Sequence, residues 1–398
     1  MSGPLAGVRV LDLTMNVMGP LAAQTLGDMG ADIWKVEPAA GDTLRGVGPA
    51  RSPGMSAYFL GLNRNKRSVV LDLKHPAARP VVERMLAGAD VLLSTFRPGA
   101  MERLGLSYES VRAVNPRIVY CNVIGYGQNG RYAHRPAYDD LIQGASGLAT
   151  MQAGPDGEPR YVAMAIVDRT VGLVAAGAIA MGLFHRERTG VGQKIEVPMF
   201  ETMAQLVMSD HQYGLFFEPP LGSFGYPRML DPNRRPYRTR DGYVSAMVYT
   251  DAHWQRFFVL AGRPEMRDDP RYATIAGRTE RIGELYAFIA RTLAEMTTAE
   301  AVQRLDEADI PVSPVHTPQT LLEDPHIAEV GLFEAVEHPT EGTIRPAGIA
   351  SRWSASQPAV LRQAPRLGEH TREILAELGF DGAQIDELLA DGAALSPT

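Results

Sequence analysis

Val8-Arg-Val-Leu-Asp-Leu13 and Ala31-Asp-Ile-Trp-Lys-Val-Glu37 are two short apolar stretches that flank a helical segment, Pro20 to Met29. Both stretches have the length of buried strands, and a proline suits the first turn of the helix between them. A strand–helix–strand unit of this size predicts two neighbouring parallel strands. Further strands are expected at 67–73, 90–94 and 117–123, with helical stretches such as 77–86 between them. We therefore predict an α/β fold built on a parallel sheet.

The composition excludes several classes of protein. The chain has 398 residues and a formal net charge of −7, which argues against a nucleic-acid-binding protein. Its single cysteine, Cys121, excludes an internal disulfide framework and fits a reducing compartment. The N-terminal residues lack a basic region and a long apolar run, so we expect no signal peptide, and we expect the most apolar stretch, Val171 to Phe184, to be too short to span a bilayer. We expect a soluble, cytoplasmic protein without a membrane partner.

The length suggests two domains, and the sequence changes character between residues 213 and 240. Prolines are frequent there, which is typical of a linker or a mobile loop. A strand at 242–248 and several amphipathic helices follow, so we predict a smaller α/β domain at about 225–320. Thr297-Thr-Ala-Glu300 resembles a capping box before one of these helices. We assign 1–212 to the first part of a large domain, 213–240 to the linker and 321–398 to a return to the large domain.

Basic residues gather around the third and fourth predicted strands. They are Arg64, Lys66, Arg67, Lys74, Arg97 and Arg103. Loops at the carboxyl ends of strands line one crevice in a doubly wound sheet, and Lys74, Arg97 and the Thr14–Pro20 loop fall at such ends. Two interpretations are open: a solvated charged face, or an electropositive site for a ligand with several phosphates. The Thr14–Pro20 loop lacks Gly-x-Gly-x-x-Gly, which disfavours a dinucleotide site and a dehydrogenase.

One carboxylate stands at the start of a long apolar run. Ala165-Ile-Val-Asp-Arg-Thr-Val-Gly172 contains Asp168, and the run from Val171 to Phe184 predicts a helix that is apolar on most faces and therefore buried. The residues before it, 161–167, suit a short extended segment. Asp168 would then lie at the first helical turn, where N–H groups and the helix dipole would hold it ionised. From position alone it is either an N-cap or a catalytic carboxylate.

A set of motifs in a fixed order resembles the family III CoA-transferases, the CaiB/BaiF or formyl-CoA transferase type. The matching segments are Gly30-Ala-Asp-Ile-Trp-Lys-Val-Glu-Pro38, Asn63-Arg-Asn-Lys-Arg-Ser68, Leu71-Asp-Leu-Lys74, Phe96-Arg-Pro-Gly99, Tyr138-Asp139, Arg188-Thr-Gly-Val-Gly-Gln193 and Leu367-Gly-Glu-His-Thr371. Their joint order over nearly the whole chain is highly specific. The resemblance implies a Rossmann-like large domain, a small domain, and two ring-like chains interlocked as a homodimer.

The resemblance also implies roles for individual residues. Asp168 falls on the catalytic aspartate of the family, which attacks an acyl-CoA and carries CoA as an aspartyl thioester between mixed anhydrides. The implied CoA-contacting residues are Val17, Met18, Leu71, Asp72, Leu73, Lys74, Thr95, Phe96, Arg97, Arg103, Ala137, Tyr138 and Asp139. The expected partners are an acyl-CoA and a free carboxylic acid. Coenzyme A is a substrate, and we expect no metal and no tightly bound cofactor.

Two alternative functions stay open on the sequence alone. α-Methylacyl-CoA racemases belong to the same family and need a histidine before an aspartate, where this chain has Ala137-Tyr-Asp139. A tyrosine cannot readily replace an imidazole near neutral pH, which disfavours a racemase. The second alternative is a protein that binds CoA without turnover, which the intact Asp168 disfavours. Neither the donor nor the acceptor acid is named by the sequence.

Overall fold

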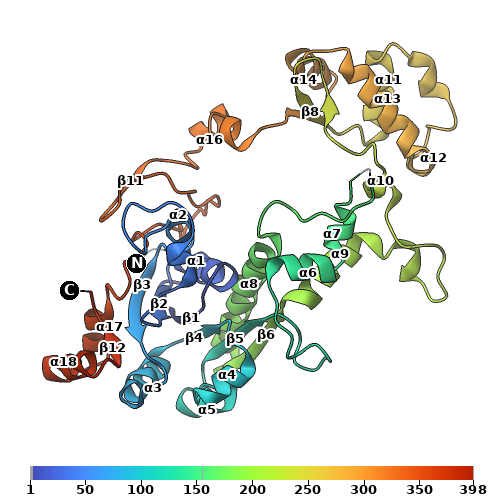
Figure 1. Cartoon of the computed structure of the whole chain (residues 1–398). Coiled ribbons are helices and arrows are strands. Elements are labelled where there is room, and N and C mark those ends of the chain that lie inside the picture. The colour runs from blue at the N-terminus through green and yellow to red at the C-terminus, as the bar shows by residue number, and fades with distance from the viewer. Residues whose placement is uncertain (1–2, 155, 398) are drawn as a thin grey trace. The chain divides into compact units, whose positions relative to one another are not determined.

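The chain folds into two compact units (Figure 1). The computed structural model describes residues 3–154 and 156–397. The large unit holds the described residues of Met1–Gln152, Arg160–Gln205 and Glu329–Thr398, and the small unit holds those of Ala153–Pro159 and Leu206–Ala328. The large unit is therefore built from both ends of the chain. The domain boundaries given above, at 212, 213–240, 225–320 and 321, stay a prediction.

The large unit is organised around a seven-stranded sheet in the order β12-β3-β2-β1-β4-β5-β6. The strands are β1 (Arg9–Leu13), β2 (Asp32–Glu37), β3 (Lys66–Leu71), β4 (Val91–Ser94), β5 (Val119–Ile124), β6 (Gln193–Pro198) and β12 (Ala394–Leu395). Strands β1 to β6 are parallel, with Val10 beside Ile33 and Val91, whereas β12 runs antiparallel beside β3. The predicted parallel α/β fold is confirmed, and the predicted strands coincide closely with observed ones.

Successive residues of the central strands face two different apolar cores, because side chains alternate between the faces of a strand. Val10 and Val91 belong to one core, and their neighbours Leu11 and Leu92 belong to the other. The first core includes residues of α1 (Met18–Asp28), α6 (Asp139–Ala145), α8 (Ile166–Thr189) and α9 (Met199–His211). The second includes residues of α3 (Arg79–Gly88), α4 (Pro98–Arg103), α5 (Tyr108–Val114), α17 (Thr371–Glu377) and α18 (Gly382–Ala390). Helices thus cover both faces of the sheet, as a parallel sheet requires.

Six short elements complete the large unit: η1 (Thr43–Gly46), α2 (Ala57–Leu60), η2 (Pro76–Ala78), α7 (Leu148–Met151), β10 (Val336–His338) and β11 (Gly342–Ile344).

The small unit has an apolar core of its own. Its elements are η3 (Tyr213–Phe216), α10 (Pro227–Leu230), β7 (Tyr237–Arg238), β8 (Tyr243–Ala246), α11 (Asp251–Leu260), η4 (Pro264–Asp268), α12 (Ile275–Glu280), α13 (Ile282–Ala294), α14 (Thr298–Glu307), β9 (Val312–Pro314), α15 (Pro318–Leu321) and α16 (Pro325–Glu329). The predicted capping box is confirmed, because Thr297 Oγ1 accepts from the N–H of Glu300 and a Glu300 carboxylate oxygen accepts from the N–H of Thr297.

Helix α8 differs from its prediction in burial and in length. The sequence predicts a helix buried on most faces, but Leu173, Met181 and Phe184 are 55%, 73% and 65% exposed. Its other face, which includes Val171 and Ile179, packs into the first core. The helix has 24 residues, so by length and composition alone it could cross a membrane, and the expectation that it is too short is wrong. Long apolar helices in the cores of soluble proteins also have this length and composition, and α8 lies against α1 and β5.

Candidate active site

A cavity of about 590 Å³ lies at the carboxyl ends of β1, β4 and β5. Its lining includes residues 15–18 after β1, residues 95, 97 and 98 after β4, and residues 123–125 at the end of β5. The strand order runs β3-β2-β1 to one side and β4-β5-β6 to the other, so the direction of chain progression reverses between β1 and β4. Open α/β sheets bind ligands at such a switch point, because the loops that follow the two central strands diverge there. Topology therefore identifies this cavity as the candidate site.

The cavity brings together about half of the residues expected to form the site. Those that line it are Val17, Met18, Thr95, Arg97, Ala137, Tyr138 and Asp168. Leu71, Asp72, Leu73, Lys74, Phe96, Arg103 and Asp139 are not among the lining residues. Leu71 is buried within β3, whereas Asp72, Lys74 and Arg103 are exposed.

Two close backbone approaches shape the wall of the cavity. A Cβ atom on Gly172 of α8 would lie 2.6 Å from the carbonyl oxygen of Met18, so only glycine lets α8 pack this closely on the start of α1. A Cβ atom on Gly125 would lie 2.2 Å from the Cβ atom of Ala137, so the end of β5 and the segment before α6 can touch only through a glycine. These approaches place Met18, Ala137 and the first turn of α8 around one space.

Asp168 is the third residue of α8, not its N-cap. The helix begins at Ile166, and the N-cap residue Ala165 has no capping side chain. The backbone N–H of Asp168 donates to Oδ2 of Asp139 (3.0 Å), so the carboxylate of Asp139 satisfies an N–H of the first turn. The interpretation of Asp168 as a cap is therefore wrong, and its own side chain is left to face the cavity. The predicted extended segment at 161–167 is also wrong, since residues 161–165 form no strand and the helix starts at 166.

Asp139 is itself held in place by the next turn of α6. Nε2 of Gln143 donates to Oδ1 of Asp139 (2.6 Å), and Oε1 of Gln143 accepts from the N–H of Val162 (2.9 Å). The chain of bonds connects α6, the segment before α8 and the first turn of α8. Sequence reasoning assigned Asp139 to CoA contact, whereas its observed bonds fix the backbone of Asp168.

The environment of Asp168 changes its acidity. Burial and the negative charge of Asp139 raise the pKa of Asp168 to about 6, while Arg169 acts in the opposite direction. The sequence predicts that N–H groups and the helix dipole favour the ionised form, whereas burial and Asp139 shift the pKa towards the neutral form. At pH 7 a group with this pKa is still ionised in roughly nine molecules of ten. Desolvation also leaves the ionised form less well solvated than an exposed aspartate.

The positive charge of the site comes from fewer residues than the sequence suggests. Arg97 lines the cavity, and so does Arg135, whose guanidinium stacks 4.1 Å from the ring centroid of Tyr132. Arg135 is absent from the residues predicted for the site, although it stands just before the quoted Tyr138-Asp139 motif. Among the described residues, no group of three or more His, Cys, Asp or Glu side chains is placed to hold a metal ion.

Three of the basic residues expected at the crevice or on a solvated face are paired inside the protein. Arg64 pairs with Asp28 (2.7 Å), Lys66 with Asp12 (3.4 Å) and Arg67 with Asp32 (2.6 Å). These three residues therefore form neither an electropositive crevice nor a solvated charged face, so both predictions for them are wrong. Consecutive residues of β3 point to opposite faces of the sheet, so Lys66 and Arg67 cannot serve one crevice.

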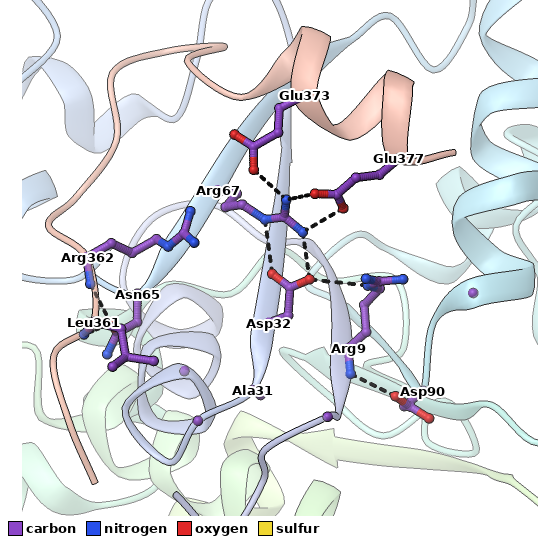
Figure 2. Close-up of a pocket in the computed structure, with 14 residues that line it drawn as sticks. Arg9, Ala31, Asp32, Asn65, Arg67, Asp90, Leu361, Arg362, Glu373 and Glu377 are labelled. Carbon is purple, nitrogen blue, oxygen red and sulfur yellow. Dashed lines mark hydrogen bonds and ion pairs between the residues drawn. The ribbon is translucent and has the colours of Figure 1, made fainter. Parts of the chain in front are cut away.

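A second cavity, of about 690 Å³, opens at the amino ends of the strands (Figure 2). Arg67 bonds Asp32, Glu373 and Glu377 there, and Nε of Arg9 donates to Asp32 (3.2 Å). The charges of these groups offset one another. Ligands of open α/β sheets bind at the opposite, carboxyl end of the strands, so the candidate site stays at the switch point.

Comparison with known proteins gives one consistent result. The sequence profile of CoA-transferase family III matches residues 5–371. The chain is 34% identical over 391 residues to succinyl-CoA:glutarate CoA-transferase of Mus musculus, which covers 98% of this chain and 90% of that protein. It is also 34% identical over 390 residues to succinate–glutarate CoA-transferase of Agrobacterium fabrum, covering 94% and 96%. A crystal structure of Rv3272 from M. tuberculosis matches with a TM-score of 0.82 and 34% identity, over 94% of this chain and 99% of that one.

Proposed function

The chain belongs to CoA-transferase family III and is a CoA-transferase, and we propose that Asp168 carries CoA from the donor acid to the acceptor acid. One observation carries this proposal. Asp168 is the single carboxylate among the described residues that line the cavity at the switch point. A covalent relay needs a nucleophile inside the site, and a carboxylate can exchange acyl groups with thioesters when the geometry is intramolecular.

The proposed reaction has four steps that return Asp168 to its starting state. A carboxylate oxygen of Asp168 attacks the acyl-CoA carbonyl and expels the CoA thiolate, which forms a mixed anhydride. The thiolate attacks the aspartyl carbonyl, releases the donor acid and forms an aspartyl-CoA thioester. The acceptor carboxylate attacks that thioester, and the thiolate leaves again. The thiolate then attacks the acyl carbonyl of the second anhydride, which yields the new acyl-CoA and the free carboxylate.

The electrostatics of the site suit this relay. Burial and Asp139 raise the pKa of Asp168 only to about 6, so the carboxylate is still mostly ionised at neutral pH. An incompletely solvated carboxylate is a stronger nucleophile than one that must first lose bound water. The backbone of Asp168 is anchored through Asp139, so the nucleophile is held in one place during all four steps.

We propose that CoA enters with its phosphates near Arg97 and Arg135, because these two guanidinium groups line the cavity. Lys74 and Arg103 are exposed and do not line the cavity. We propose that they bind the 3′-phosphate of CoA, which lies far from the thiol in this long ligand. Leu71, Asp72, Leu73 and Phe96 remain part of the proposed contact surface. Val17, Met18 and Thr95 would face the pantetheine arm, next to Ala137, Tyr138 and Asp139.

We propose a dicarboxylic acid as one of the two acids. The relatives described above are named for succinyl-CoA, succinate and glutarate, which derive from dicarboxylic acids. Kinetic screening of thioesters of dicarboxylic, short-chain monocarboxylic and aromatic acids tests this. Equal kcat/KM for succinyl-CoA and butyryl-CoA would contradict a dicarboxylate preference.

We further propose a cytoplasmic homodimer of interlocked chains. The exposed apolar side chains of α8, such as Met181 and Phe184, form the kind of surface that a partner subunit covers. Interlocked subunits cannot separate without unfolding, so dilution should not yield folded monomers. Analytical ultracentrifugation that finds a stable, active monomer would contradict this proposal.

The proposed function is tested by trapping the covalent intermediate. The protein is incubated with succinyl-CoA and hydroxylamine, which converts an aspartyl thioester into a hydroxamate. Mass spectrometry should find the hydroxamate on Asp168. Asp168→Asn should abolish turnover and trapping while it retains CoA binding. As a control, Asp140→Asn changes an exposed carboxylate of the same region and should leave both unaffected. Trapping on Asp139 would assign the relay to another carboxylate, and α-proton exchange without transfer would indicate a racemase.

A further inference from the structure

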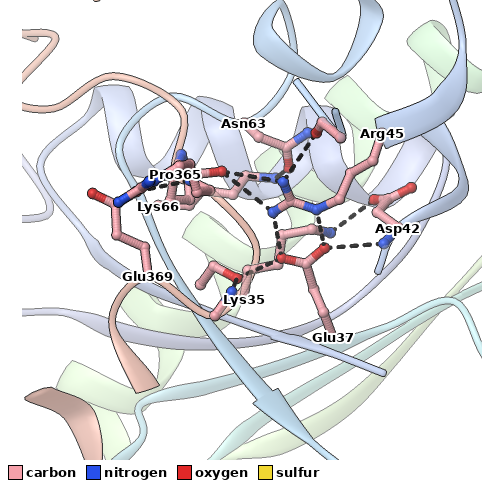
Figure 3. Close-up of polar contacts among 12 residues, drawn as sticks. Lys35, Glu37, Asp42, Arg45, Asn63, Lys66, Pro365 and Glu369 are labelled. Carbon is pink, nitrogen blue, oxygen red and sulfur yellow. Dashed lines mark hydrogen bonds and ion pairs between the residues drawn. The ribbon is translucent and has the colours of Figure 1, made fainter. Parts of the chain in front are cut away.

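Next to the loop that lines the cavity lies a group of buried charged side chains that the mechanism does not use (Figure 3). Lys35 of β2 pairs with Asp42 (Nζ to Oδ2, 2.9 Å), and Lys66 of β3 pairs with Asp12 of β1 (Nζ to Oδ2, 3.4 Å). All four side chains are 0% exposed. Removing charges from water is unfavourable, and their mutual attraction often does not compensate for it. A fold that keeps two such pairs side by side therefore needs another reason for them.

Both lysines hold the main chain of the loop between β1 and α1. Nζ of Lys35 donates to the carbonyl oxygen of Thr14 (2.8 Å), where the loop begins. Nζ of Lys66 donates to the carbonyl oxygen of Pro20 (2.9 Å), just after the loop, and to Oδ1 of Asn63 (2.9 Å). The residues between these two anchors, 15–18, line the cavity.

The two carboxylates bind the same loop through its N–H groups. Oδ1 of Asp12 accepts from the N–H of Thr14 (2.9 Å), and Oδ1 of Asp42 accepts from the N–H of Asn16 (3.1 Å). Asn16 has a φ of 67°, a left-handed conformation that few residues other than glycine adopt. The bond from Asp42 therefore supports a backbone conformation that the loop would not keep by itself. Three of the four charged groups thus bond the loop directly, and Lys66 bonds the first turn of α1 that follows it.

We infer that Lys35 and Lys66 are positioning residues of the transferase, which hold the loop of residues 14–20 in the conformation that receives CoA. This inference rests on the proposal that the cavity binds CoA. Neither lysine lines the cavity or touches the reacting atoms. Their role is to hold the main chain of this loop in one conformation, so that a long, flexible ligand binds without the entropic cost of ordering the loop.

The charge states of the two lysines agree with this role. Burial lowers the pKa of Lys66 to about 8, in opposition to Asp12 and Asp42. Burial acts in the same direction on Lys35, but Asp12, Asp42 and Glu37 together raise its pKa above the ordinary value. Both side chains are therefore ammonium ions at neutral pH, with the N–H donors that the loop carbonyls require.

The test compares two variants that each remove one buried cation. Lys35→Met keeps an unbranched side chain of similar length and removes the ammonium group. Arg67→Met is the matched control, because Arg67 is also buried among carboxylates of the large unit but serves the cavity at the amino ends of the strands. For both we would measure unfolding by denaturant, the Kd of CoA by calorimetry, and hydrogen exchange of the peptide that spans residues 14–20.

We expect Lys35→Met to raise the Kd of CoA roughly tenfold or more, as the loss of one charged hydrogen bond would, and to speed exchange in residues 14–20. Arg67→Met should reduce stability and leave both quantities at their wild-type values. CoA binding that is unchanged in Lys35→Met, or weakened equally in Arg67→Met, would overturn the inference.

A milder variant keeps the test decisive where Lys35→Met does not fold. Asp42→Asn retains the acceptor for the N–H of Asn16 and removes the counter-charge of Lys35, so the Kd of CoA should rise by a smaller factor. No rise in a folded Asp42→Asn protein would overturn the inference. The underlying site is checked separately with Arg97→Ala. Unchanged CoA affinity in that variant would contradict the proposed CoA site, whatever the lysine variants show.

Discussion

Asp168→Asn should produce an inactive protein that is more stable than the wild type at neutral pH. The wild-type carboxylate is partly buried beside Asp139, so its ionised form is unfavourable in the folded state. Asparagine has nearly the same shape and carries no charge, and the N–H of residue 168 still donates to Asp139. The substitution therefore removes an unfavourable charge without removing the contact that anchors the helix.

The magnitude follows from the pKa of Asp168. A carboxyl group whose pKa rises from 3.8 to about 6 on folding lowers the free energy of unfolding of the protein by about 3 kcal/mol when it is ionised. Because the folded protein binds the proton more tightly than the unfolded chain, the protonated carboxyl group of Asp168 stabilises the folded state. This stabilisation is complete below pH 3.8 and is lost as the pH rises through 6. Asp168→Asn should thus exceed the wild type by up to about 3 kcal/mol above pH 7. The difference should close as the pH falls from 6 to 4.

Denaturant unfolding of both proteins at several pH values between 4 and 8 measures this difference, and Asp140→Asn controls for the general effect of removing a surface carboxylate. An Asn variant that is less stable at every pH, by an amount that does not depend on pH, would refute the argument that Asp168 is desolvated. An Asn variant with transferase activity near that of the wild type would refute its role as nucleophile. The two results are independent, since one concerns solvation and the other chemistry.

Four further predictions concern the pH profile of the reaction and three other parts of the chain. The kcat/KM of the wild type should fall about tenfold for each pH unit below 6, because the protonated Asp168 cannot attack; a rate that is level from pH 7 to 4 would argue against this pKa. Arg97→Ala and Arg135→Ala should each weaken CoA binding, with less effect at 1 M salt than at 0.1 M, as calorimetry would show. Gly172→Val should lower the free energy of unfolding by about 2 kcal/mol or more and reduce CoA affinity, because its Cβ atom would meet the Met18 carbonyl. Thr297→Ala should destabilise the small unit by about 1 kcal/mol in denaturant unfolding, through loss of the capping box, with kcat unchanged.

Burial on two faces made the large sheet predictable from sequence. Strands such as β4 and β5 are buried throughout and mostly apolar because helices cover both sides, and such runs stand out from the polar loops between them. The position of Asp168 at the start of a helix was predictable for the same reason, since α8 has an unusually long apolar run. The capping box at Thr297 was visible because its two residues lie three apart in the sequence and each bonds the backbone N–H of the other.

Features that depend on pairing between distant segments were not predictable. Nothing in the sequence near Asp168 shows that Asp139, on another helix, accepts its N–H and raises its pKa. The basic residues of β3 looked like one cluster, but the alternation of side chains sends Lys66 and Arg67 to different carboxylates. Arg135 lies in a loop, where no periodicity marks it. The apolar run of α8 predicted burial, but it could not tell which face the rest of the chain would cover.

The edge of the main sheet has a consequence for the synthesis of the protein. Strand β3 lies at residues 66–71, and its outer neighbour β12 comes from residues 394–395, almost the last of the chain. At usual elongation rates β3 is made roughly 20 to 60 s before its partner strand exists. During that time its outer edge offers unpaired N–H and C=O groups to any other extended segment. In the folded chain residues 370–371 also cover this edge, because the N–H of His370 donates to the carbonyl oxygen of Ser68 and Oγ1 of Thr371 accepts from the N–H of Val70. A chain that ends before residue 370 would therefore keep the edge open permanently, and early termination there would yield an aggregation-prone protein even though the cavity residues are all present.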